Sequence, residues 1–196
     1  MGDQRFPMEH EYRGVWQVVL PLADIPDYKL DVEYDGNTLP AEDPYRFLPT
    51  LGEVDLHLIG EGRHEQLWQV LGAHTHVYDS LHGPVEGTSF AVWAPNARGV
   101  RVVGDFNYWD GAGHPMRSLG SSGVWELFVP GVGNGTKYKF GVLGADFTWR
   151  DKADPVAFYA EPAPQTASVV FTSGYQWQDS DWMQRRAESN PHTGPM

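Results

Sequence analysis

The sequence has no cysteine, few basic residues and no long apolar run, and each absence excludes a class of protein. Without cysteine there is no disulfide framework and no thiol nucleophile or ligand, which fits a reducing cytoplasm. Against 26 Asp and Glu the chain has only 14 Lys and Arg, and this formal net charge of −12 repels nucleic acid and anionic lipid. No apolar run approaches the length of a membrane span, and the first residues lack the pattern of a signal peptide. We therefore expect a cytoplasmic protein whose partners are neither nucleic acid nor membrane.

The residues that are abundant favour an all-β fold. Aromatic residues make up 13% of the 196 residues, eight of them Trp, and there are 22 Gly and 15 Pro. This mixture is typical of short strands joined by many turns, rather than of a helical bundle. The length allows one full domain and part of another.

The region 77–174 contains the most regular strand pattern. In "VRVVGDF" the residues Val100, Val102, Gly104 and Phe106 fall on one face, and similar short runs precede and follow it at even spacing. Runs of this kind predict an antiparallel, immunoglobulin-like β-sandwich of about a hundred residues.

The remaining segments predict smaller units around this sandwich. Residues 1–45 contain two short strand-like runs and indicate part of a second β-sandwich, because so few strands cannot form a stable domain alone. The segment 46–76 changes to a helical period and predicts a connector of short helices. Residues 175–196 are polar and predict a lead-out toward a region that is absent.

The candidate catalytic and metal-binding motifs in the sequence each lack a residue that the site would require. "HEQLW" begins like a zinc-protease helix, but Trp68 stands where the second His ligand is required. The pair His74 and His76 has no third ligand in view. The many Asp residues lie in turns, where Asp is common for backbone reasons, so none is assigned a catalytic role. We expect no catalytic residue, no metal and no cofactor in this chain.

Two tryptophans near turns are the remaining candidates for function. Trp109 lies in the turn "NYWDG", and Trp149 follows "GAD", which we interpret as a three-residue hairpin loop. That loop places Trp149 opposite Gly141, on the same face as Lys139, so that one flat side of the indole is uncovered. The apolar face of a glucose ring can stack on such a surface while Lys and indole N–H donors bind its hydroxyls. The alternative is that both rings pack under loops, because Trp is usually buried.

These residues lie in a framework that resembles a known family. The runs "FAVWAPNARGVRVVGDFNYWDG", "YKF", "KADP" and "QTASVV" are similar to carbohydrate-binding module family 48, a glycogen-binding sandwich. The connector, above all "RFLPTLGEVDLHL", resembles the amino-terminal region of bacterial α-1,4-glucan branching enzymes, particularly the actinobacterial type.

The resemblance implies specific site residues. Related modules contact α-glucan through two Trp and a Lys, which match Trp109, Trp149 and Lys139 here. A polar residue of the last strand, usually Asn, also takes part, and Ser168 stands at about that position.

The resemblance also implies a larger parent protein. It would be a glycoside hydrolase family 13 enzyme that transfers α-1,4-glucan chains to 6-hydroxyls in glycogen biosynthesis, without a cofactor. Its catalytic barrel would begin after about Met196, so the present chain would bind α-glucan (glycogen or malto-oligosaccharide) and pack against that barrel. Two alternatives remain open here: a purely structural packing module, and the module of a debranching or trehalose-forming relative.

Overall fold

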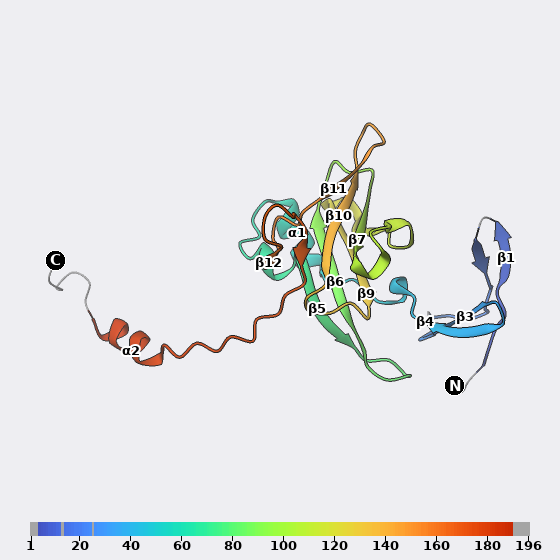
Figure 1. The fold of residues 1–196 in the computed structure, drawn as a ribbon, viewed down its shortest axis with the longest axis horizontal. Helices are drawn as coiled ribbons and strands as arrows, with labels where there is room; N and C mark the ends of the chain where they lie inside the picture. Colours follow the sequence, from blue (N-terminus) through green and yellow to red (C-terminus); the bar gives the residue numbers. More distant parts are fainter. Residues whose placement is uncertain (1–3, 13, 25, 190–196) are drawn as a thin grey trace.

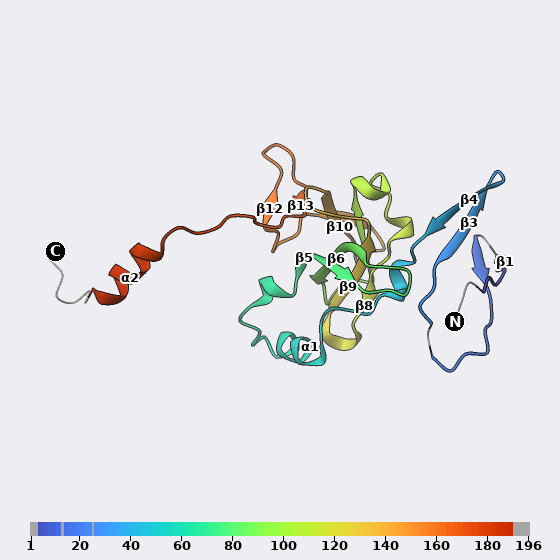
Figure 2. The same ribbon diagram turned by 90° about the horizontal axis from the view of Figure 1, so that it is seen from below.

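A β-sandwich forms the body of the molecule in the computed structural model, which describes residues 4–12, 14–24 and 26–189. Two small amino-terminal hairpins lie on one side of this body, and a carboxyl-terminal segment ending in a helix extends from the other (Figures 1 and 2). Among the described residues, no helix is long and apolar enough to cross a bilayer.

The first sheet of the sandwich is antiparallel and has the order β5-β6-β9-β8. The long central pair runs from Gly87 opposite Pro130 to Trp93 opposite Val124. Its strands are β5 (Gly72–Tyr78), β6 (Val85–Trp93), β9 (Val124–Pro130) and β8 (Arg117–Ser118). Because β5 begins at Gly72, the sandwich includes residues that the sequence analysis assigned to the connector.

The second sheet is built around β10. One edge of this strand pairs with β7 from Tyr138 to Leu143, and the other edge pairs with β11 and with β13. Its strands are β7 (Gly99–Gly104), β10 (Lys137–Leu143), β11 (Trp149–Lys152), β12 (Tyr159–Ala160) and β13 (Ser168–Val169). The prediction of an antiparallel sandwich is confirmed.

The main core lies between these two sheets. Alternate residues of each strand point inward, so a two-residue period in the sequence becomes one continuous apolar layer. The most buried members are Phe90, Val100, Val102, Leu127, Tyr138, Phe140 and Val170.

The connector covers the outer face of the first sheet. It contains η1 (Pro44–Arg46), the helix α1 (Glu53–Gly60) and η2 (Leu67–Gln69), which confirms the predicted short helices. Leu51 and Ile59 pack on Ala91 and Val124, whereas Phe47 packs on Phe128.

Buried polar residues fix the start of the connector. The buried carboxylate of Glu126 accepts hydrogen bonds from the backbone N–H of Thr50 at 2.7 Å and from its hydroxyl at 2.6 Å. Arg117, the β8 partner of Glu126, donates to the carbonyl of Phe47 at 2.8 Å. The covered face therefore joins the connector through apolar packing and through these hydrogen bonds of Glu126 and Arg117.

The amino-terminal hairpins are β1 (Glu9–Tyr12) with β2 (Val15–Gln17), and β3 (Leu30–Tyr34) with β4 (Asn37–Ala41). Each forms its own two-stranded sheet. Both strand-like runs predicted before residue 45 are thus present, although β1 and β4 were missed. That they are part of a second sandwich stays a prediction.

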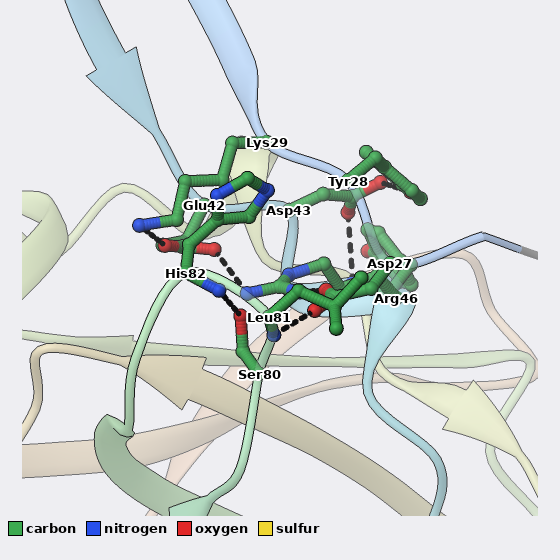
Figure 3. A network of polar contacts seen from close by, with 10 residues as sticks. Asp27, Tyr28, Lys29, Glu42, Asp43, Arg46, Ser80, Leu81 and His82 are labelled. Carbon is green, nitrogen blue, oxygen red and sulfur yellow. Dashed lines mark hydrogen bonds and ion pairs between the residues drawn. The ribbon is translucent and has the colours of Figure 1, made fainter. Parts of the chain in front are cut away.

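A polar network joins the second hairpin to the sandwich (Figure 3). The guanidinium of Arg46 forms ion pairs with Asp27 and Glu42, and its side chain is 5% exposed. Asp27 also accepts the backbone N–H of Leu81, in the turn between β5 and β6, at 2.5 Å. Burial and the bond to Asp43 raise the pKa of Tyr28 to about 12.

The carboxyl-terminal segment contains the helix α2 (Ser180–Glu188), which the sequence analysis did not predict. Figure 1 shows this helix separated from the sandwich by an extended stretch. Three short 3-10 turns complete the fold: η3 (Asp105–Asn107), η4 (Gly111–Gly113) and η5 (Gly120–Ser122).

Candidate functional site

Two of the candidate residues, Lys139 on β10 and Trp149 on β11, lie on the outer face of the second sheet. Residues of β7, β10 and β11 that alternate with the core point outward here: Arg101, Lys139, Gly141, Trp149 and Asp151. Trp149 pairs with Leu143, not with Gly141 as predicted, because the hairpin loop is residues 144–148 and not three residues. A register error of two residues keeps the side chain on the same face, so Trp149 still shares the face of Lys139.

Trp149 has a different neighbour from the one predicted. The guanidinium of Arg101 lies 4.4 Å from the centre of its indole ring, in the space above Gly141. The residue is 40% exposed. Gly141 therefore does not leave the indole uncovered on this side, because Arg101 occupies the space that the glycine provides.

Trp109 is held by the loop that follows β7. Its backbone N–H donates to the carbonyl of Gly104 at 3.0 Å, and its indole N–H donates to Asp105 at 3.3 Å. The residue is 38% exposed. Tyr108 and Trp109 both have positive φ, at 52° and 63°, a conformation that non-glycine residues adopt at a cost of about 1–2 kcal/mol each. Tyr108, which the sequence analysis left without a role, is 94% exposed.

Lys139 lies between the two tryptophans along the sheet. Its ammonium group donates to the hydroxyl of Thr166 at 2.8 Å, a partner that the sequence analysis did not identify. Because Lys has three donors, two remain for a ligand.

Ser168 does not join the other three candidates. It pairs with Tyr138, whose side chain is in the core, and paired residues point to the same face of a sheet. It is 1% exposed, and its hydroxyl accepts the backbone N–H of Asp154 at 2.9 Å. Its side chain is therefore directed away from the surface of Lys139 and Trp149, which corrects its placement as a contact residue.

The carboxylates of this region have structural partners. Asp154 accepts the hydroxyl of Tyr138 at 2.5 Å, and burial raises the pKa of both groups. Asp110 caps η4 by accepting the N–H of Ala112, and Asp146 pairs with Arg150. Within the part of the chain that the structure describes, no group of three or more His, Asp or Glu is placed to hold a metal ion.

The geometry is suited to a flat, neutral, hydroxyl-rich ligand. It combines half-exposed indoles with amine and guanidinium donors on an open sheet, and offers no buried nucleophile or paired carboxylates at that surface. Sequence reasoning missed Arg101, although its position between Val100 and Val102 in an alternating strand was a signal that it faces outward.

Comparison with known proteins gives one family match and several similar structures. Residues 70–157 match the family model "Carbohydrate-binding module 48 (Isoamylase N-terminal domain)". A type I pullulanase from Bacillus subtilis complexed with maltose overlaps 55% of this chain and 14% of its own, with 25% identity and a TM-score of 0.42.

The curated relatives match over the full chain. The 1,4-alpha-glucan branching enzyme GlgB of Thermobifida fusca is 64% identical over 100% of this chain and 26% of its own length, and that of Nocardia farcinica is 58% identical with the same coverage. The chain thus spans about a quarter of the length of these relatives. Residues 70–157 are thus similar to family 48 carbohydrate-binding modules, and the whole chain is similar to the amino-terminal region of actinobacterial GlgB branching enzymes.

Proposed function

We propose that this chain is the non-catalytic, α-glucan-binding region of a cytoplasmic glycogen branching enzyme. The observation that carries the proposal is the outer face of the second sheet, where Trp149 and Lys139 share one surface and Trp109 stands at the end of the adjoining strand. Two indoles at opposite ends of β7 can each stack on a glucose ring of one chain, and Lys139 between them can bind hydroxyls.

The size of the relatives gives this region its context. The similarity over about a quarter of the branching enzymes supports a parent that moves segments of α-1,4-glucan onto 6-hydroxyls. Binding at an open, shallow surface is useful there, because it holds a long polymer near a catalytic domain without enclosing its end. A formal charge of −12 on the chain is compatible with a neutral polymer.

Calorimetric titration of the chain with maltoheptaose tests the proposal. Trp149→Ala and Trp109→Ala are each expected to lower affinity about tenfold or more, since an aromatic stacking contact contributes about 1 kcal/mol beyond area burial. Trp177→Ala is the matched control, because Trp177 is 76% exposed and lies between β13 and α2, outside the strands of the sandwich. The proposal fails if both site variants bind maltoheptaose as tightly as the unmodified chain.

A second candidate function is purely structural: the sandwich orients a catalytic domain and binds no sugar. The covered first sheet favours it, because the connector is fixed there by Glu126 and Arg117. Tryptophan fluorescence separates the two candidates. A spectral change on saturation with malto-oligosaccharide that is absent in Trp149→Ala supports glucan binding, whereas no change in the unmodified chain supports the structural role.

A further inference from the structure

Arg101 lies in a slot that two glycines create. A Cβ atom on Gly141 would be 2.9 Å from Cγ and 3.0 Å from Nε of Arg101, and a Cβ on Gly111 would be 2.5 Å from its Cδ. Real Cβ atoms do not approach so closely, so both positions need glycine for this side chain to lie flat across β10. The aliphatic part of Arg101 is therefore held between a strand and the loop that carries Trp109.

The position of the Arg101 side chain between Gly111 and Gly141 places its guanidinium beside Trp149. The two groups are 4.4 Å apart, within the range of a cation–π contact, and the planar group limits how the indole can turn. The indole is thereby held against Arg101 while the residue stays 40% exposed.

The donors of Arg101 are not used by the protein. Among the described residues no side-chain or backbone acceptor is bonded to its guanidinium, and Nε is buried without a partner. This differs from Lys139, whose ammonium is bonded to Thr166. A guanidinium carries five N–H donors in one plane, so the two terminal nitrogens beside the indole are free for oxygen acceptors of a ligand.

We propose that Arg101 is a further glucan-binding residue, which positions the Trp149 indole and donates hydrogen bonds to hydroxyl oxygens of the sugar stacked on it. This inference rests on the proposed function of the same surface. We infer a neutral sugar hydroxyl as the acceptor, because the guanidinium lies against an indole, which provides a stacking surface for a sugar ring. The carboxylate of Asp151, the strand partner of Gly141, offsets one of the two positive charges, Arg101 and Lys139, on this face.

Arg101→Met is the variant that tests the donors. It keeps the unbranched aliphatic chain that packs against Gly111 and Gly141 but removes all five N–H groups. We expect affinity for maltoheptaose to fall about five- to tenfold, as hydrogen bonds from a charged donor are lost, while the thermal unfolding midpoint stays near that of the unmodified chain. Arg98→Met is the matched control, because Arg98 also lies 4.4 Å from an aromatic ring, that of Phe147. It is expected to bind normally.

Gly141→Ala tests the slot without removing the charge. The added methyl group displaces Arg101 from the sheet, so affinity is expected to fall while the guanidinium remains. Normal binding by Arg101→Met, when Trp149→Ala has lost binding, overturns the inference and leaves the proposed function intact. Normal binding by Trp149→Ala and Trp109→Ala overturns the proposed function itself. An equal loss in Arg98→Met and Arg101→Met also overturns the inference, because it would report net charge alone.

Discussion

On each outer face of the sandwich a glycine makes room for a large side chain, but one face is covered by the connector and the other is open. On the first sheet a Cβ on Gly87 would be 2.5 Å from the ring of Phe128, and on the second a Cβ on Gly141 would be 2.9 Å from Arg101. Each glycine thus lets a large side chain lie across its sheet. Phe128 is then covered by Phe47 of the connector, whereas Arg101 lies between the Gly111 loop and the half-exposed Trp149.

This difference separates stability from binding. The covered face removes apolar area from water, and Thr50 of the connector donates two hydrogen bonds to its buried carboxylate, so its contacts contribute to folding. The open face leaves indole surface and donors in contact with water, so its groups contribute little to folding and remain free for a ligand. Substitutions on the two faces should therefore affect different measurements.

Phe128→Ala should have the largest effect on stability. The ring is buried and packs on Phe47 and Tyr78 at 4.6 and 4.7 Å between centroids, so its loss is expected to lower the free energy of unfolding by about 3–5 kcal/mol. Urea denaturation measures this change. Maltoheptaose affinity, measured below the unfolding transition, should stay within about twofold of that of the unmodified chain, because Phe128 and the open face do not share contacts. A parallel loss of affinity would mean that the faces are coupled.

Glu126→Gln should have a smaller effect that depends on pH. Burial raises the pKa of Glu126, outweighing the hydrogen bonds from Thr50 and the charge of Arg117, which lower it. A carboxyl whose folded pKa lies above its unfolded value stabilises the fold fully below the unfolded pKa, and that stabilisation is lost as pH rises through the folded pKa. Glutamine cannot ionise, so the stability of the variant relative to the unmodified chain should increase from about pH 4 to pH 7.

Urea denaturation at several pH values measures the Glu126 effect. Glu86→Gln, at an exposed position of the neighbouring strand β6, is the matched control. A difference between Glu126→Gln and the unmodified chain that does not change with pH would contradict the prediction.

Asp146→Asn, beside the open face, should have the smallest effect. Asp146 is exposed and pairs with Arg150 at 2.6 Å, and this partner lowers its pKa. A carboxylate whose pKa is lowered in the folded state stabilises the fold at pH values above its unfolded pKa, and this stabilisation is lost as the pH falls through the folded pKa. Because solvent screens an exposed ion pair, the contribution is small. Neither the thermal midpoint at neutral pH nor maltoheptaose affinity should change measurably. A fall in affinity would show that this loop orients Trp149.

Much of the fold could be predicted because alternation is a local property. The runs around Val100, Phe90 and Phe140 place apolar residues at every second position, and each became a strand that directs those residues into the core. Strands without such alternation, among them β1, β4 and β12, were missed, because they are short and exposed. The helix α2 was missed for a similar reason, since it buries no residue.

The candidate site was predicted less completely. Trp149 and Lys139 were placed on one face because strand parity survives an error of two residues in the loop length. Ser168 was misplaced because its partner in the sheet is Tyr138, and pairing between strands so far apart in the chain is not a local property. Arg101 was overlooked because the room for it comes from Gly111 and Gly141, which belong to other elements.

The sequence by itself determined the strands, the connector helix and the residues that resemble a glucan-binding module, because these depend on the period and identity of neighbouring residues. Only the tertiary structure decided which sheet is covered and which is open. It also decided that Ser168 turns inward and that Arg101 reaches Trp149. The physical reason is that the burial and the contacts of a side chain depend on which segment, distant in the sequence, packs on its face. No local pattern of residues specifies that segment.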